Sequence, residues 1–199
     1  MGVIDLARWD LAALAQEWKR ARPFSHVVVD GLLSADDHAS LARAFAWEPH
    51  YHAVDEIYSQ LRSATPPVQP VVRAFHDALT GPAVRAAVAQ LSGKPLSGGE
   101  GAGYVYLERH YLLPHADHRE HEGRSIAFAY YVASPGSGGE LELYACTRRA
   151  GAIVRTRVAR RIEPVANRLV LFDVSADSLH RVAEVRSGAR QSVAGWYFA

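Results

Sequence analysis

The 199-residue chain has one cysteine, almost no net charge and no long apolar run. Because Cys146 has no second cysteine to pair with, an intrachain disulfide is excluded and a reducing compartment is expected. A formal net charge of +1 gives no reason to expect nucleic acid or a membrane surface as the main partner. No apolar run approaches the length of a transmembrane helix, and residues 1–22 lack the apolar core of a secretory leader. These absences predict a cytoplasmic protein.

The composition that is present is that of one globular domain. Hydrophobic residues make up 49% of the chain and charged residues 22%, so residues 1–199 can bury a sizeable core. Arginine outnumbers lysine twenty to two and alanine is abundant, a bias typical of a GC-rich bacterial genome. We therefore expect a single enzyme-sized domain, with residues 1–102 as a helical support region and residues 103–198 as a β-rich core.

The support region shows apolar residues at helical spacing, interrupted by capping residues and prolines. Residues 47–63 are polar and aromatic without clear periodicity, which favours a loop reaching the mouth of an active site. Residues 92–103 are rich in glycine, serine and proline and mark the change to β-rich sequence. The pattern predicts helices over residues 5–20, 34–46, 66–79 and 82–91, with a short strand at 26–30.

From residue 104 onward the chain reads as short strands separated by turn residues. The predicted strands cover residues 104–110, 125–133, 140–145, 153–162, 168–172, 179–185 and 191–198. Gly138 and Gly139 lie in one of the turns, where a positive φ is needed. Short strands at this spacing are typical of a sandwich or jelly-roll.

Two histidines and one aspartate have the residue types of a facial iron site. His115 and Asp117 are two residues apart, and His180 lies far along the chain, where a β-fold can bring it back to the pair. Two imidazoles and one carboxylate hold one side of an octahedral iron(II) and leave the other side open. Arg190 follows ten residues after His180 and can hold a carboxylate with a bidentate guanidinium.

These residues lie within a longer series of motifs. In order, they are YLLPHAD at 111–117, RSIAFAYYV at 124–132, GGEL at 138–141, NRLVLFD at 167–173, SLHRV at 178–182 and RQSVAGW at 190–196. Over residues 103–198 the series resembles the iron(II)- and 2-oxoglutarate-dependent dioxygenases, in particular their prolyl 4-hydroxylase-like branch. The resemblance implies a mainly β fold, a cupin-like double-stranded β-helix or jelly-roll with N-terminal helices packed on one face.

The resemblance also implies roles for individual residues. His115, Asp117 and His180 match the metal ligands, and Fe(II), 2-oxoglutarate and O2 are the implied cofactor and cosubstrates. Arg190 matches the residue that pairs with the distal carboxylate of 2-oxoglutarate, with Ser192 as an additional hydroxyl. An intact carboxylate at Asp117 favours hydroxylation, because related halogenases have a small residue there.

The chain departs from the family pattern in places. His110 and Ala133 occupy positions that usually hold a small residue and an asparagine. The tyrosine that assists the cosubstrate has no unambiguous match. Tyr104 and Tyr106 lie on one face of a strand, and we rank Tyr106 first. Arg186 competes with Arg190, but its spacing from His180 is shorter than the family's.

For the substrate we expect an amino acid, a carrier- or peptide-bound residue or a similar small polar metabolite, hydroxylated with release of succinate and CO2. The candidate contacts are His118, Arg119, Glu120, His121, Tyr144, Asp55 and Tyr58. His118 and His121 also leave open a zinc cluster with His115. Desaturation, epoxidation and cyclisation share the same oxidative chemistry and stay open.

Six arginines fall within residues 148–161. A solvated hairpin face is the simpler interpretation, and a docking patch for an acidic carrier protein or a phosphorylated substrate is the alternative. For the whole chain, the alternative function is a non-catalytic or hydrolytic cupin-type metal-binding jelly-roll. Arg190 separates the two functions, because a metal hydrolase does not need a buried arginine aimed at a dicarboxylate.

Overall fold

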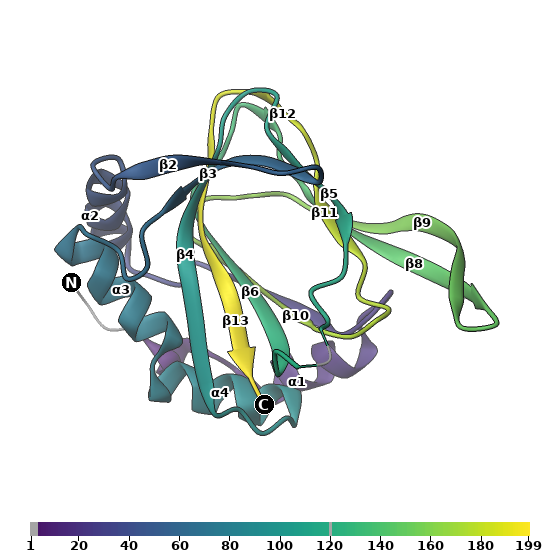
Figure 1. Cartoon of the computed structure of the whole chain (residues 1–199). Helices are drawn as coiled ribbons and strands as arrows, with labels where there is room; N and C mark the ends of the chain where they lie inside the picture. The colour runs from purple at the N-terminus through teal and green to yellow at the C-terminus, as the bar shows by residue number, and fades with distance from the viewer. Residues whose placement is uncertain (1–3, 120) are drawn as a thin grey trace.

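The structure is a computed structural model that describes residues 4–119 and 121–199 (Figure 1). Its helices are the short 3-10 helix Leu6–Arg8, α1 Leu11–Arg20, α2 Ala35–Phe45, α3 Pro70–Thr80 and α4 Pro82–Ser92. The early strands are β1 His26–Asp30, β2 His50–Val54, β3 Tyr58–Ser63, β4 Gly98–Tyr106, β5 Tyr111–His115, β6 Arg124–Ala133 and β7 Ser137–Gly138. The later strands are β8 Leu141–Arg149, β9 Ala152–Ile162, β10 Arg168–Asp173, β11 His180–Val182, β12 Val185–Ser187 and β13 Arg190–Phe198.

One curled antiparallel sheet contains most of the strands. Its order is β1-β10-β6-β13-β4-β3-β5-β11-β8-β9, with β2 paired to β3, while β12 and β7 form a separate pair. The order differs from the chain order because strands remote in sequence pair across the fold, as in a jelly-roll. The predicted fold class is confirmed.

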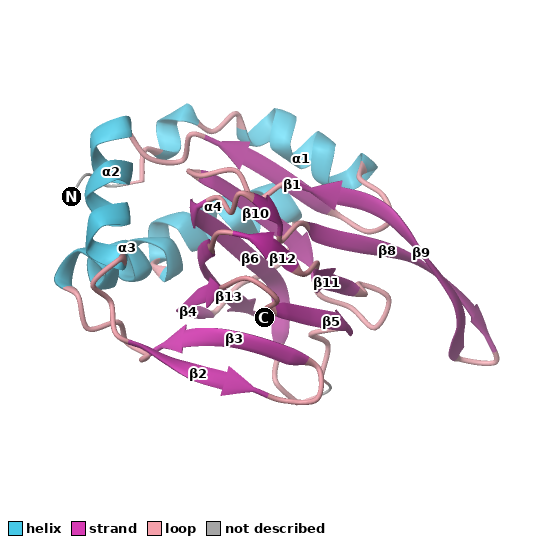
Figure 2. Cartoon of the chain, turned by 90° about the horizontal axis from the view of Figure 1, so that it is seen from above, coloured by secondary structure: helices cyan, strands magenta, loops and turns pink. Residues whose placement is uncertain are grey.

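The helices cover one face of the sheet (Figure 2). They begin where the sequence supplies caps: the Asp10 side chain accepts from the Ala13 N–H at α1, and Ser34 accepts from the Asp37 N–H at α2. Their apolar sides form a core with the outward-facing residues of β6, β10 and β13, among them Phe128 and Tyr197. This core fixes the sheet from behind and leaves the other face for the site.

The other face of the sheet lines the inside of the jelly-roll. Its core includes Tyr131, Leu143 and Phe172, each from a different strand. Along β13 the side chains alternate, so that Val193 and Tyr197 pack toward the helices while Trp196 packs toward the inside. Arg190 and Ser192 share the parity of Trp196 and therefore belong to the inner face.

Several segments differ from the sequence-based expectations: β4 begins at Gly98, β5 was not predicted, and the strand predicted at 179–185 is divided into β11 and β12. Residues 47–63 do not form a loop: β2 and β3 make a hairpin, and β3 continues the sheet by pairing with β4 and β5. The segment lacks alternation because much of it is exposed on both faces, and its strands are decided by pairing with neighbours that are remote in sequence. The strand predicted at 140–145 extends to Arg149 and, with β9, forms a hairpin that projects from the body (Figure 1).

Among the described residues, no helix combines the length and apolarity that crossing a membrane demands.

Gly195 marks a close approach between β13 and β4. A Cβ added there would lie 1.9 Å from the Glu100 carbonyl oxygen and 2.6 Å from the Gly101 Cα, both backbone atoms that cannot move aside singly. We therefore expect Gly195→Ala to lower the free energy of unfolding by about 3 kcal/mol or more, measured by urea denaturation. Gly98→Ala on the same strand pair is the control, because its Cβ would meet only the Phe198 ring at 3.8 Å. Equal losses in both variants would contradict the prediction.

Candidate active site

Three side chains from two segments converge on the inner face. His115 ends β5, Asp117 follows it directly, and His180 begins β11, which pairs with β5 so that the two histidines are opposite each other. One ligand atom from each of the three residues lies within 4.8 Å of the others. Asp117 and His180 are buried and His115 is partly exposed, so one side of the cluster faces outward.

Backbone carbonyls orient both imidazoles. His115 Nδ1 lies 2.9 Å from the Leu113 oxygen, and His180 Nδ1 lies 2.9 Å from the Ser178 oxygen. A protonated Nδ1 donates to such a carbonyl and leaves Nε2 as the free lone pair. The two Nε2 atoms each lie 3.5 Å from a different oxygen of the Asp117 carboxylate. Two nitrogens and a carboxylate arranged in this way fit the facial site of iron(II).

The protonation states also suit metal binding. Burial lowers the pKa of His180 to about 4, so its imidazole is neutral at neutral pH. Burial of Asp117 opposes its ionisation, but the neighbouring imidazoles of His115 and His180 outweigh that effect and keep the pKa of its carboxyl below the ordinary value. A neutral imidazole and an ionised carboxylate are the forms that bind a metal.

A buried cation lies deeper on the same inner face. Arg190 is 3% exposed, and its guanidinium carbon is 4.9 Å from the ring centroids of both Tyr106 and Tyr131. Within residues 4–119 and 121–199 no carboxylate pairs with it, and its Nε has no hydrogen-bond acceptor. The buried hydroxyls of Tyr131 and Ser192 are also without partners in that part of the chain. Burying an unpaired charge costs several kcal/mol, so this pocket fits an anion with several acceptor oxygens.

The sequence comparison decides the family. Residues 102–198 match the sequence profile of the 2OG-Fe(II) oxygenase superfamily. Residues 102–198, the C-terminal half of the chain, belong to this superfamily. The superfamily's name gives Fe(II) and 2-oxoglutarate as the cofactor and cosubstrate of its members, and His115, Asp117 and His180 offer a ligand set for Fe(II).

Known proteins place this oxygenase in the prolyl hydroxylase-like branch. It is 42% identical over 103 residues to prolyl 3-hydroxylase OGFOD1 of Xenopus laevis, an alignment that covers 48% of this chain and 18% of the relative. It is 37% identical over 92 residues to OGFOD1 of Mus musculus, an alignment that covers 44% of this chain and 16% of the relative. The chain thus matches less than a fifth of the length of these curated relatives.

Solved structures share its fold. A prolyl-4-hydroxylase from Pseudomonas putida superposes with a TM-score of 0.72 at 22% identity, covering 94% of this chain and 98% of the other. A prolyl hydroxylase from Trichoplax adhaerens, solved with a peptide fragment of hypoxia inducible factor, gives a TM-score of 0.70 at 16% identity, covering 96% and 93%.

Of the two candidate tyrosines in the oxygenase, Tyr106 lies beside Arg190, its partner across β4 and β13. Tyr104 is one pair further along, opposite Ser192, with the Arg62 guanidinium carbon 5.9 Å from its ring centroid. Burial raises the pKa of Tyr104, opposed by the charge of Arg62 and reinforced by that of Asp117. Tyr104 therefore lies between the anion pocket and the His-Asp-His cluster.

The predicted substrate contacts are not all brought to the site. His118, Arg119 and His121 are exposed on the loop that follows Asp117, and Glu120 lies outside the described residues. Asp55 and Tyr58 belong to the β2–β3 hairpin, where Tyr58 pairs with Leu112 of β5. Tyr144 faces away from the cluster: its hydroxyl donates to Glu142 on the outer side of β8. Tyr144 is therefore removed from the set.

Sequence reasoning missed a second group next to the cluster. Trp196 was not among the predicted site residues; its ring is half-buried, and the Arg124 guanidinium carbon lies 3.7 Å from the ring centroid. The Trp196 indole also helps to lower the pKa of Asp117, which places it at the cluster. The sequence did offer a signal for Trp196: it is an even number of residues from Arg190, so the two side chains are expected on the same face of β13. Tyr131 was missed too. Side chains alternate along β6, so Tyr131 faces the inside while its neighbour Tyr130 packs toward the helices.

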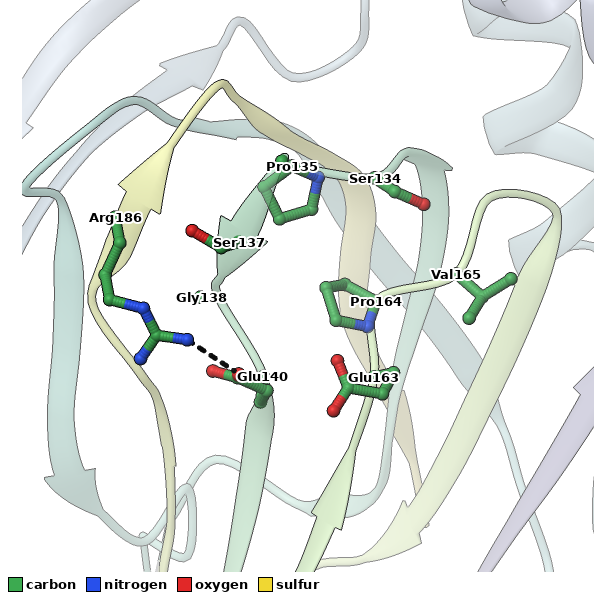
Figure 3. Close-up of a pocket in the computed structure, with 10 residues that line it drawn as sticks. Ser134, Pro135, Ser137, Gly138, Glu140, Glu163, Pro164, Val165 and Arg186 are labelled. Atoms are coloured by element: carbon green, nitrogen blue, oxygen red, sulfur yellow. Dashed lines mark hydrogen bonds and ion pairs between the residues drawn. The ribbon is translucent and has the colours of Figure 1, made fainter.

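The competing arginine lies elsewhere. Arg186 is exposed and its side chain reaches Glu140 at 3.5 Å, in a pocket of 310 Å³ (Figure 3). That pocket is formed by the turns around Pro135 and Pro164. Because Arg186 already has a partner there, the unpaired Arg190 is the better candidate for the cosubstrate.

Proposed function

We propose that this oxygenase hydroxylates an unactivated C–H bond of a prolyl residue in a polypeptide, with conversion of 2-oxoglutarate and O2 to succinate and CO2. The names of the OGFOD1 relatives and of the Pseudomonas putida structure support prolyl chemistry. The peptide bound to the Trichoplax adhaerens enzyme supports a polypeptide substrate. Peptide-bound residues are one of the substrate classes that the sequence predicts, and free amino acids and carrier-bound residues are the others.

The observation that carries the proposal is the unpaired, buried Arg190 beside two hydroxyls without partners. In this proposal Arg190 donates to the distal carboxylate of 2-oxoglutarate, and Ser192 and the Tyr131 hydroxyl donate to the same end. Tyr106 lines this end of the cosubstrate site and Tyr104 the space toward the metal. A cupin-type hydrolase or a metal-storage jelly-roll would gain nothing from burying this cation.

His115, Asp117 and His180 would hold the iron. When bound, iron with 2-oxoglutarate supplies activated oxygen for attack on a C–H bond. The protein's own contribution is position, charge and exclusion of water. The Leu113 and Ser178 carbonyls fix the imidazoles, and the carboxylate of Asp117 favours hydroxylation because it occupies the position that a halide would take.

The substrate would approach over the exposed side of the cluster. We propose that Arg124 and Trp196 face the substrate there, because a guanidinium stacked on an aromatic ring offers a flat apolar surface with donors at its edge. The further proposed contacts are His118, Arg119 and His121 on the following loop and Asp55 and Tyr58 of the β2–β3 hairpin, together with Glu120, which lies outside the described residues. The zinc alternative for His118 and His121 is less favourable, because both are exposed.

We also propose that residues 1–199 fold as one domain. β1, from the support region, pairs with β10, and β3 pairs with β4 and β5 of the catalytic region. Neither region completes the sheet without the other. The cytoplasmic location and bacterial origin stay predictions from composition.

Anaerobic titration with iron(II) and 2-oxoglutarate tests the cosubstrate site. We expect the weak visible charge-transfer band that arises when 2-oxoglutarate chelates the metal. Its absence with folded protein would overturn the proposed function. In air, a proline-containing peptide should gain the mass of one oxygen atom with one succinate per turnover. If free proline or a carrier-bound prolyl group gained this mass and peptides did not, the proposed polypeptide substrate would be wrong, while the proposed oxygenase activity would stand.

A further inference from the structure

The outer part of the β8–β9 hairpin is an arm: Leu141, Leu143 and Ile162 at its base belong to the inner core, and no residue between them and the tip does. From Leu143 to Ile162 it carries six arginines and no aspartate or glutamate, in a chain whose net charge is only +1. The arm projects away from the body of the molecule (Figure 1). Along β9, residues 152–157 are all exposed, including the apolar Val154 at 57%. This local excess of positive charge lies on the part of the hairpin that contributes no side chain to the described cores.

Two of the six arginines have acidic partners and the others do not. Arg161 donates to Glu142 at 2.8 Å, and Arg148 contacts Asp177. Arg149, Arg155, Arg157 and Arg160 form no ion pair in the part of the chain that the structure describes. Among the described residues, the arm thus presents four guanidiniums without an ion-pair partner.

Strand pairing places the unpaired arginines on a defined face. Leu143 is opposite His180 on one side and opposite Arg160 on the other, so these three side chains lie on the same face of the sheet. Further out, Arg157 is opposite Ala145 and Arg155 is opposite Thr147. At ~3.3 Å per residue, Ala145 and Thr147 lie roughly 7 and 13 Å beyond Leu143 along β8. The arginine row therefore continues outward from the face that holds the metal cluster.

The edge of the arm favours a polypeptide partner. β9 is the last strand of the sheet and pairs only with β8, so its second row of backbone N–H and C=O groups is available along the projecting part. An extended polypeptide can pair with such an edge while its alternate side chains meet one face. A nucleic acid matches the charge but has no use for the row of backbone donors and acceptors.

We infer that the β8–β9 arm binds an acidic, extended segment of the polypeptide substrate, with Arg155 and Arg157 facing its carboxylates. The inference rests on the proposed polypeptide substrate and names its chemistry: acidic residues at alternate positions, several residues away from the one that is oxidised. Charge on the arm then selects substrates, while the jelly-roll interior performs the reaction.

Fluorescence anisotropy with labelled peptides tests this inference without requiring turnover. The full chain, loaded anaerobically with iron(II) and 2-oxoglutarate, is titrated with a proline peptide that carries alternate glutamates and with its glutamine counterpart. We expect the glutamate peptide to bind at least about tenfold more tightly at low salt, with the preference falling as salt is raised. Arg155→Ser with Arg157→Ser should remove the preference. The matched control, Arg8→Ser with Arg43→Ser, removes the same charge from exposed sites on the helical side and should retain it.

Three outcomes would overturn the inference. Equal affinity for both peptides would mean that the arginines only protect a sheet edge from aggregation. If the Arg8 and Arg43 control lost the preference for the glutamate peptide to the same extent, the preference would come from the overall charge of the protein and not from the arm. Tighter binding of a single-stranded oligonucleotide of equal charge, with loss in the arm variant, would assign the surface to nucleic acid. Selective peptide binding without any hydroxylation would support the arm and overturn the proposed function instead.

Discussion

Asp117→Ala is expected to lower both iron(II) affinity and turnover by more than about a hundredfold. The carboxylate is one of the three proposed ligands, and even changes to the groups around a metal site cost 10- to 100-fold. Its loss also removes the negative charge between two imidazoles at 3.5 Å on either side. Iron affinity can be measured by anaerobic titration and turnover by succinate release.

Glu108→Ala provides the control for that variant, because it removes one exposed carboxylate from the turn before β5. Its iron affinity and turnover should stay within about twofold of the parent, as for most surface substitutions. Full activity in Asp117→Ala would exclude the His-Asp-His cluster as the metal site. A loss of helix and sheet signal in circular dichroism would show that the variant had failed to fold, and Asp117→Asn would then replace it.

Arg190→Ala should weaken the binding of 2-oxoglutarate by more than about a hundredfold, while the affinity for iron changes by less than about threefold. The guanidinium is the only buried cation in the described part of the anion pocket, and a charge-assisted pair in such a place has a large effect on affinity. The charge-transfer band reports 2-oxoglutarate binding, and a metal titration without cosubstrate reports iron. Equal weakening of both would exclude Arg190 as the cosubstrate anchor.

Two further variants sharpen this result. Arg186→Ala removes the exposed neighbour that pairs with Glu140 and should leave the cosubstrate affinity unchanged. Arg190→Met keeps the volume of the side chain and removes the unpaired charge. Because that charge is costly without an anion, the cosubstrate-free Arg190→Met protein should melt no lower than the parent. A large fall in its melting temperature would point to a purely structural role.

The fold could be predicted where local pattern and pairing agree. The helices at residues 11–20 and 35–45 have caps and apolar spacing that need no tertiary context, and the strands of residues 103–198 alternate or form apolar runs. The β2–β3 hairpin could not be predicted, because β2 is largely exposed, the residues that β3 buries are the polar Gln60 and Ser63, and β3 pairs with strands remote in sequence. The outward extension of β8 was missed for the same reason.

The sequence alone determined the chemistry, because His115, Asp117, His180 and Arg190 are residue types with few other uses in that order. Only the tertiary structure decided which neighbours join them. Tyr131 and Trp196 face the site and Tyr144 faces away, since one residue of parity on a strand reverses the side chain. The arm follows the same rule: its arginines are visible in the sequence, but pairing across β8 and β9 places them on the face of the metal cluster.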